Sequence, residues 1–281
     1  MRTLIVGGSG FLGSKLVEAL NGSSQSTYHS HPLFSGQVNL DLSDEASIRK
    51  CLAETRPEVI FHCGGLTNTD FCESNQDLVL RINVSGTNEL ISSFDGKIIY
   101  FSTDYVFDGE NAPYDENSPP NPINHYGKTK LVAERMVLDK PQNLIVRVSG
   151  LYGFNGNNNR FLDGLRKYGV IAASQKLIST PTYIEDIVKA VPEFMGMSGI
   201  LHFIGEQSFS RYDFAKLAVE SLGLDAEVVA QESNGIARKP RNSSLVSVYS
   251  LRKTPIDKAL KEIRRAIWKE QKNFRKYVNW D

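Results

Sequence analysis

A tyrosine and a lysine stand four residues apart in the stretch HYGKTK, at Tyr126 and Lys130. Residues at positions i and i+4 lie on one face of a helix, so both side chains can point into one crevice. A free phenol has a pKa of about 10, and a nearby ammonium lowers that pKa because it stabilises the phenolate. The pair therefore predicts a proton donor to a substrate carbonyl. Taken alone, the same spacing is also typical of a surface tyrosine that packs on a lysine side chain.

Three glycines near the N-terminus predict a nucleotide-binding turn. In LIVGGSGFLGSKLVEAL (residues 4–20), an apolar strand precedes the glycines and apolar residues at helical spacing follow them. Such glycines permit a tight turn, let the backbone approach a pyrophosphate, and let helix and strand pack closely. A plain structural turn is the alternative. The residues assigned to the cofactor from this stretch are Gly7, Ser9, Gly10, Phe11, Leu12 and Gly13.

The end of the second expected strand, SQSTYHS (residues 24–30), bears on the choice of cofactor. A dinucleotide site for NAD usually carries an acid here, bonded to the ribose 2′-hydroxyl. Residues 28–32 hold no carboxylate, and His29 and Ser30 could accept a 2′-phosphate. The sequence therefore favours NADP over NAD, although the arginine typical of strong NADP binders is missing. A surface-loop role for His29 is the alternative. Asp41 follows a third strand and is expected nearer the adenine.

Strands and helices alternate along the first half of the chain, which predicts an α/β fold with a doubly wound parallel Rossmann sheet. The strands expected after the first three are PEVIFHCGG, KIIYFSTDYVF and NLIVRVSGLYG. Ligands bind at the carboxyl ends of the strands in such sheets. We expect the strand ends at Gly64, at Ser102 and Thr103, and at Ser149 to open toward one crevice.

The pattern becomes irregular after residue 150, where GFNGNNNRF is expected to be a loop. We predict a dinucleotide-binding domain over residues 1–150, to which 183–206 return. Residues 151–182 and 207–281 are predicted to form a smaller mixed α/β substrate-binding part. In its last helix, Ile256, Leu260, Ile263 and Ile267 share one face, which is expected to pack on a core. The opposite face carries many cations and is expected to be solvated, with a surface for a partner or phospholipid as the alternative.

Composition limits the classes of partner. The 281 residues carry 32 Lys and Arg and 32 Asp and Glu, so the formal net charge is zero and gives no support to binding of nucleic acid or of an anionic membrane. No charged and then apolar leader and no apolar run near twenty residues stand out, which favours a cytoplasmic protein. Cys51, Cys63 and Cys72 have no metal-finger spacing, and His62 should point away from Cys63 in a strand, so no metal site is predicted.

In combination, these motifs resemble the extended short-chain dehydrogenase/reductase superfamily. Four stretches narrow the resemblance: STDYVFDG (102–109), PYDENSPPNPINHYGKTK (113–130), STPTYIEDIV (179–188) and ARKPRNSSL (237–245) are similar to the dTDP-4-dehydrorhamnose reductase family. The resemblance implies NAD(P)H-dependent reduction of the C4 keto group of a 4-keto-6-deoxysugar nucleotide. It also implies a homodimer.

The same resemblance implies roles for individual residues. Thr103 would donate a hydrogen bond to the substrate carbonyl, Tyr126 would be the general acid, and Lys130 would bind the ribose and lower the pKa of the phenol. The cofactor would also contact Asp41, Leu42, Cys63, Gly64, Gly65, Thr67, Ser102 and Ser149. The substrate would contact Thr103 and Val106.

The chain departs from the family pattern at two places beside the expected crevice. The family's SWVYG segment is SGLYG here, so Gly150 replaces a bulky tryptophan, and the segment FNGNNNRF that follows is atypical. The sugar accepted is therefore expected to differ. Arg238, Lys239 and Arg241 are candidates for binding the pyrophosphate of a nucleotide sugar, because guanidinium groups match phosphate geometry. A solvated basic loop is the alternative.

Three other functions, in two classes, compete with a reductase. A sugar-nucleotide dehydratase would carry Asp-Glu after the threonine, whereas Asp104 and Tyr105 follow Thr103 here; an epimerase would hold NAD tightly. A non-catalytic regulatory subunit is the alternative of a different class, because the NADP-binding regulatory subunit of methionine adenosyltransferase resembles the same reductases. Retention of both Tyr126 and Lys130 favours an enzyme.

Overall fold

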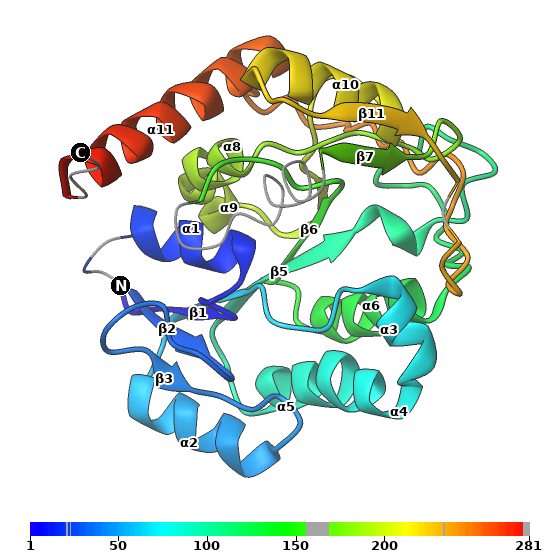
Figure 1. Cartoon of the computed structure of the whole chain (residues 1–281). Coiled ribbons are helices and arrows are strands. Elements are labelled where there is room, and N and C mark those ends of the chain that lie inside the picture. Colours follow the sequence, from blue (N-terminus) through cyan, green and yellow to red (C-terminus); the bar gives the residue numbers. More distant parts are fainter. Residues whose placement is uncertain (21, 23, 156–168, 233, 278–281) are drawn as a thin grey trace.

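A seven-stranded sheet forms the centre of the computed structural model, which describes residues 1–20, 22, 24–155, 169–232 and 234–277 (Figure 1). Its order is β3-β2-β1-β4-β5-β6-β9, and each neighbouring pair is parallel. This confirms the predicted doubly wound α/β fold. The strands are β1 (Thr3–Val6), β2 (Ser24–Tyr28), β3 (Val38–Asn39), β4 (Val59–His62), β5 (Lys97–Thr103), β6 (Leu144–Val148) and β9 (Gly199–His202).

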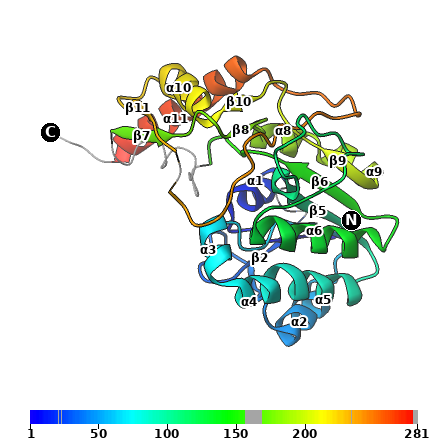
Figure 2. The same cartoon turned by 90° about the vertical axis from the view of Figure 1, so that its right-hand side faces the viewer.

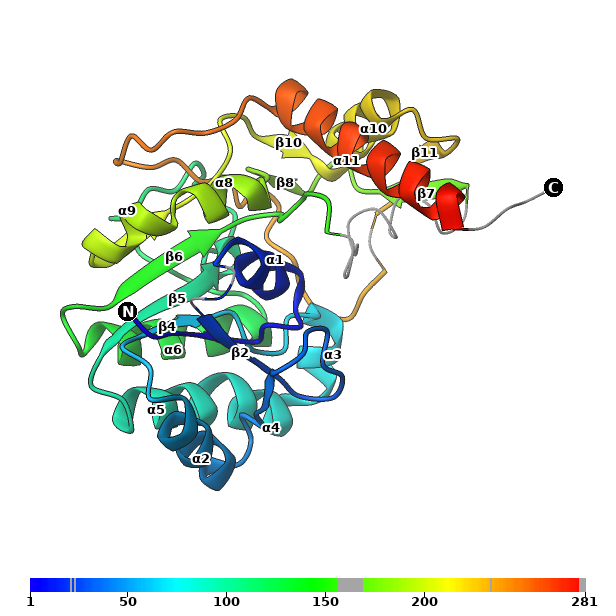
Figure 3. The same cartoon turned by 90° about the vertical axis from the view of Figure 1, so that its left-hand side faces the viewer.

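Helices cover both faces of the sheet because its central strands are apolar on both faces. On one face lie α1 (Phe11–Ala19), α8 (Ile184–Lys189) and α9 (Val191–Gly196), and on the other lie α2 (Glu45–Thr55), α5 (Gly86–Ser92) and α6 (His125–Leu138) (Figure 3). Successive strand residues serve opposite cores: Ile5 packs with Leu16 of α1, whereas Leu4 packs with Ile48 of α2.

A chain of short helices leads from β4 to α5. It comprises α3 (Thr69–Ser74), α4 (Gln76–Val79) and a π-helical turn, η1 (Leu80–Ser85). A single 3-10 turn, η2 (Asp104–Val106), follows β5 and directs the chain away from the sheet. The π-helical turn packs against α6, and η2 directly follows β5, whose carboxyl end carries predicted site residues.

A smaller α/β part lies beyond the carboxyl ends of the strands (Figure 2). It contains two two-stranded sheets, β7 (Val170–Ala173) with β11 (Glu227–Ala230) and β8 (Ile178–Ser179) with β10 (Phe209–Ser210), and two helices, α10 (Arg211–Leu222) and α11 (Ile256–Tyr277). Leu260, Ile263 and Ile267 of α11 are buried against Ala218 and Leu222 of α10, so the apolar stripe of the last helix packs into a core as predicted.

Three expectations can be compared only with the described residues. Residues 156–161 of the loop predicted in GFNGNNNRF lie outside the described residues. Within the described residues, none of the helices has the length and apolar character that crossing a membrane requires. Nor do these residues bring together three or more histidine, cysteine or acidic side chains in an arrangement that could hold a metal ion.

Candidate active site

The glycine turn between β1 and α1 is built by close backbone contacts. Gly7 has φ +80°, and a Cβ placed on it would lie 2.7 Å from the backbone nitrogen of Gly64, at the end of the neighbouring strand β4. A Cβ on Gly13 would lie 2.1 Å from the carbonyl oxygen of Gly7. These two positions therefore require glycine. The turn leaves Gly10 at the N-terminus of α1, where free backbone N–H groups favour an anion.

A cavity of about 790 Å³ extends from this helix N-terminus across the strand ends to the smaller part of the chain. Its wall includes eleven of the residues predicted for the site. They are Gly10, Phe11, Leu12, Cys63, Gly64, Gly65, Thr67, Thr103, Tyr126, Lys130 and Lys239. Segments more than a hundred residues apart in sequence thus meet in one space, as the strand ends of a parallel sheet allow.

The other predicted residues lie outside the cavity wall. Gly7 and Gly13 shape the turn, and the Leu42 side chain packs near Gly64. Val106 is fully buried in a core cluster with Phe107, so its side chain does not reach the cavity. Also outside the wall are Ser9, His29, Ser30, Asp41, Ser102, Ser149, Arg238 and Arg241.

A carboxylate does lie at the end of β2, although the sequence next to that strand holds none. β3 brings Asp41 beside β2, and its Oδ2 lies 3.9 Å from Nε2 of His29. The pKa of Asp41 is lowered, chiefly by hydrogen bonds from the hydroxyl and amide of Ser43. The ribose end of the predicted site is therefore not free of negative charge, which weakens the argument for NADP from residues 28–32.

Helix α6 positions the tyrosine and the lysine. Asn124 caps it, with Oδ1 accepting from the Gly127 amide at 2.8 Å, and its Nδ2 donates to the carbonyl of Arg238. Tyr126 and Lys130 lie on the buried face of α6, where they are 9% and 7% exposed. The ammonium of Lys130 donates to the Phe101 carbonyl at 2.7 Å.

Burial, rather than the neighbouring ammonium, controls the pKa of both groups. It lowers the pKa of Lys130 to about 7, against the opposing effects of Glu134 and Cys63. It raises the pKa of Tyr126, and the hydrogen bond with Thr103 only partly offsets this. The expected lowering of the phenol pKa by Lys130 is therefore wrong for the protein alone, because desolvation outweighs it and Lys130 is bound to Phe101.

The π-helical turn supplies a side chain whose role the sequence did not indicate. Asn83 Nδ2 donates to the Leu66 carbonyl at 2.9 Å, and its Oδ1 accepts from the Leu66 amide at 2.8 Å. Its Nδ2 also lies 3.3 Å from Oγ1 of Thr129 on α6. Asn83 thus joins the segment that lines the cavity to the helix that carries Tyr126.

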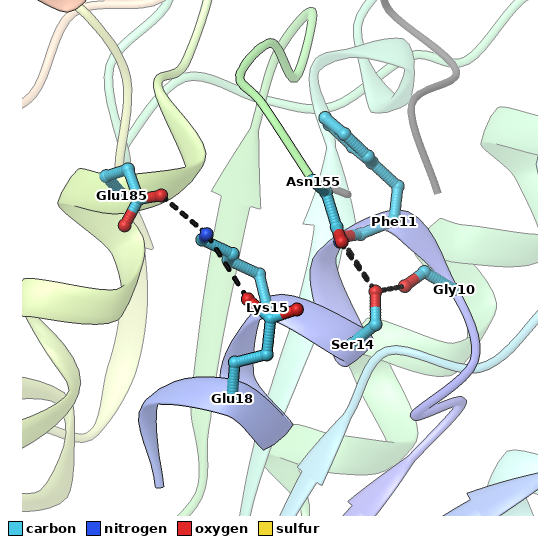
Figure 4. Close-up of polar contacts among 7 residues, drawn as sticks. All are labelled: Gly10, Phe11, Ser14, Lys15, Glu18, Asn155 and Glu185. Atoms are coloured by element: carbon cyan, nitrogen blue, oxygen red, sulfur yellow. Dashed lines mark hydrogen bonds and ion pairs between the residues drawn. The ribbon is translucent and has the colours of Figure 1, made fainter. Parts of the chain in front are cut away.

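A second asparagine connects the chain after β6 to the glycine turn. Figure 4 shows Asn155 against the first turn of α1, where its Nδ2 donates to the Phe11 carbonyl at 3.0 Å and to Ser14 Oγ at 2.6 Å. Nearby, Lys15 forms an ion pair with Glu185 of α8 at 2.8 Å. The first turn and the middle of α1 are therefore held by segments that follow β6.

Two cations of the smaller part line the cavity: Lys239, which is one of the three predicted candidates, and Arg211, which was not predicted. Arg211, the first residue of α10, donates to the Tyr105 hydroxyl at 2.6 Å, and Lys239 lies 3.8 Å from Oδ2 of Asp70. Arg238 and Arg241 flank Lys239 in sequence but lie outside the wall. No sequence pattern indicated Arg211 beyond its place at the start of a helix.

The parallel sheet, the glycine turn, and a Tyr–Lys pair that faces a threonine at a strand end define an extended short-chain dehydrogenase/reductase. The family model described as "RmlD substrate binding domain" matches residues 1–271, and the chain belongs to this family, that of the dTDP-4-dehydrorhamnose reductases. This membership places it among the NAD(P)-dependent oxidoreductases.

Known proteins align with most of this chain. The dTDP-4-dehydrorhamnose reductase of Bacillus anthracis, solved in complex with NADP, superposes with a TM-score of 0.81 at 28% identity, over 96% of this chain and 99% of its own. The dTDP-4-keto-6-deoxy-D-glucose reductase of Streptomyces niveus is 30% identical over 80% of each chain. Methionine adenosyltransferase 2 subunit beta of Danio rerio is 26% identical over 98% of this chain and 92% of its own.

Proposed function

We propose that this protein reduces the C4 keto group of a 4-keto-6-deoxysugar nucleotide with NAD(P)H. One observation carries the proposal: Thr103, Tyr126 and Lys130 line the same cavity as the N-terminus of the glycine-turn helix. A proton donor and a dinucleotide can therefore meet around one carbonyl group. The Bacillus and Streptomyces reductases support the substrate class.

The chain's residues fit a nicotinamide dinucleotide. Gly10, Phe11 and Leu12 would hold the pyrophosphate at the helix N-terminus, and Cys63 to Thr67 offer a small-residue wall beside it. The cofactor, when bound, supplies the hydride. Lys130, already buried at the cavity wall, would bind the ribose. NADP is proposed over NAD because His29 and Ser30 can accept a 2′-phosphate, although Asp41 opposes this.

Tyr126 and Thr103 would act on the substrate oxygen. As the carbonyl carbon is reduced, its oxygen gains negative charge, and Tyr126 supplies the proton while Thr103 donates a hydrogen bond. Donors fixed in a buried site stabilise such charge strongly because they need not reorganise. The raised pKa of Tyr126 keeps the phenol protonated until the oxygen becomes basic enough to take the proton.

The smaller part would bind the rest of the substrate. We place residues 151–182 and 207–281 in a substrate-binding part and residues 1–150 with 183–206 in the dinucleotide-binding part. Arg211 and Lys239 would face the diphosphate. Gly150 has φ +47°, and a Cβ there would have only ordinary contacts, so the wall beside it leaves room for a sugar substituent.

The test is oxidation of NADPH, followed at saturating dTDP-4-keto-6-deoxy sugar, with the wild type and Tyr126→Phe. Loss of the general acid should lower kcat by about 10²- to 10⁴-fold, while cofactor affinity stays within about twofold. Tyr212→Phe, on α10 and outside the cavity wall, is the matched control and should keep its rate. A Tyr126→Phe variant that retains most of its activity would remove the proton donor from this account.

A regulatory subunit is the second candidate, supported by the Danio rerio relative, which aligns with nearly the whole chain. This role would require a stable complex with a catalytic partner. Co-purification with such a partner, together with no NADPH oxidation by any keto-sugar nucleotide, would favour it. A homodimer, which the resemblance also implies, is tested separately by the mass of the isolated protein in solution.

A further inference from the structure

Asp104 is a buried acid that touches the threonine proposed to bind the substrate oxygen. It is 4% exposed at the end of β5 and lines the cavity. Its Oδ1 accepts from Thr103 Oγ1 at 3.1 Å. Its Oδ2 accepts from Ser149 Oγ at 2.9 Å and from Ser243 Oγ at 2.5 Å. Ser243 also lines the cavity, whereas Ser149 does not, so the acid connects one cavity hydroxyl and one hydroxyl outside the wall to Thr103.

The ionised acid would turn Thr103 away from the substrate. A threonine hydroxyl has one hydrogen and two acceptor lone pairs. With Asp104 ionised, that hydrogen is donated to Oδ1, and the oxygen of Thr103 accepts from the Tyr105 amide at 3.2 Å and bonds with Tyr126. Thr103 then has no hydrogen left for a carbonyl oxygen, and the Tyr126 proton is directed at Thr103.

The two serines determine where a proton on Asp104 would lie. The Ser149 hydroxyl donates to Oδ2, and the Ser243 hydroxyl lies 2.5 Å from Oδ2 but 3.3 Å from its other acceptor, the Ile178 carbonyl, so the shorter contact to Oδ2 is favoured and both lone pairs of Oδ2 are occupied. Among the described residues, Oδ1 has Thr103 as its hydrogen-bond partner. A proton on the carboxyl group therefore resides on Oδ1 and points at Thr103.

We propose that Asp104 acts in its protonated form, as a positioning residue: it donates from Oδ1 to Thr103 and so frees the Thr103 hydrogen for the substrate oxygen. Thr103 then accepts from Asp104 and from the Tyr105 amide and donates into the cavity, while Tyr126 is free to donate to the same oxygen. Asp104 keeps its proton throughout the reaction. This inference rests on the proposed function for the identity of the substrate oxygen.

The surroundings of Asp104 favour the neutral acid. Burial is the largest influence and raises its pKa, whereas the hydroxyls of Ser243, Ser149 and Thr103 and the guanidinium of Arg211 lower it. The other ionisable groups that face it are Tyr126 on α6 and Tyr105 on η2. A substrate diphosphate bound at Arg211 would offset that cation and raise the pKa of Asp104 further, so substrate binding itself would promote the active form.

Replacement of Asp104 by asparagine distinguishes a protonated from an ionised acid. In Asp104→Asn, the oxygen can accept from both serines while the NH₂ donates to Thr103, which reproduces the neutral acid at all pH values. This variant should lose less than about tenfold in kcat, whereas Asp104→Leu, which leaves Thr103 without a donor, should lose about 10²- to 10³-fold, as for an oxyanion donor. The alkaline loss of activity caused by ionisation of Asp104 should disappear in Asp104→Asn, while the effect of Lys130 remains in both proteins.

The protonation state of Asp104 can also be measured without turnover. This measurement can fail or succeed independently of the proposed reductase activity. Infrared difference spectra of the protein with bound NADP, recorded across the pH range, should contain the C=O band of a buried carboxylic acid. Asp104→Asn should lack this band, and Ser243→Ala should retain it to higher pH because one donor to the carboxylate is gone. A wild type without the band wherever it is active would overturn the inference. So would a folded Asp104→Asn that loses more than about 100-fold in kcat, because an ionised carboxylate would then be required.

Discussion

The carboxylate of Glu134 binds the guanidinium of Arg147 through two hydrogen bonds, Nε to Oε1 at 3.0 Å and a terminal nitrogen to Oε2 at 2.7 Å. Both side chains are 2% exposed. Glu134 lies one turn after Lys130 on α6, and Arg147 lies on β6. The ion pair therefore fixes the helix that carries the proposed catalytic side chains against the sheet.

Removal of one member of this ion pair should be costly. Glu134→Gln leaves a buried guanidinium without a charge partner, which lowers the free energy of unfolding by about 3 to 5 kcal/mol. Chemical denaturation of the protein alone measures this loss. The double variant Glu134→Leu with Arg147→Met should lose less than the single variant, because no unpaired charge remains. Equal losses would show that the pair does not act as a unit.

Substitution of Arg211 should raise the KM for the nucleotide sugar, whereas substitution of Arg238 should not. Arg211→Gln removes the cation on the cavity wall, and loss of a charge-assisted hydrogen bond of about 1.5 to 3 kcal/mol raises KM for the nucleotide sugar by roughly 10- to 100-fold. Steady-state kinetics at saturating NADPH measure the change. Arg238→Gln removes the same charge outside the wall and should leave KM within about twofold. The reverse ranking would restore the arginine predicted from the sequence.

The cofactor preference should respond to Asp41. Its lowered pKa keeps it ionised at neutral pH, where its charge would repel a 2′-phosphate near His29. Asp41→Asn removes a repulsion of about 1 kcal/mol, so the ratio of kcat/KM for NADPH to that for NADH should rise about fivefold. Glu54→Gln, on the outer side of α2, makes the same charge change as a control. An unchanged ratio in Asp41→Asn would place the ribose elsewhere.

Stability without cofactor should depend on pH through Lys130. Its pKa is about 7 in the folded protein and about 10.4 in an unfolded chain. Between these values the unfolded chain holds a proton that the folded protein has lost, so stability rises with pH. From pH 7 to pH 9 the wild type should gain about 2 kcal/mol more than Lys130→Met. Denaturation curves measure this, and Lys128→Met on the exposed face should behave as the wild type.

The sequence predicts those parts of the site that depend on local pattern. The glycine turn, the strands and the Tyr–Lys spacing each lie within a single segment, and their chemistry restricts them to few conformations. The parallel sheet then brings their ends together, so the catalytic side of the cavity could be anticipated from Gly10, Thr103 and Tyr126.

The remaining features depend on how distant segments fold back. Arg211 reaches the cavity because α10 begins there, and Arg238 does not because its neighbour Lys239 occupies the wall. β3 carries Asp41 to the side of His29, which no reading of residues 28–32 could show. The pKa of Tyr126 depends on burial, and burial is a property of the complete fold.

The π-helical turn at Leu80–Ser85 holds one more residue per turn than an α-helix would, and the orientation of Asn83 depends on it. One extra residue per turn rotates all that follows by about 100° relative to an α-helix, and this rotation directs Asn83 at both backbone groups of Leu66. Deletion of one residue from this turn would restore regular α geometry and turn the amide away, without altering any side chain of the cavity wall. The geometry of the site thus depends on the residue register of a helical segment that does not itself contact the reacting groups.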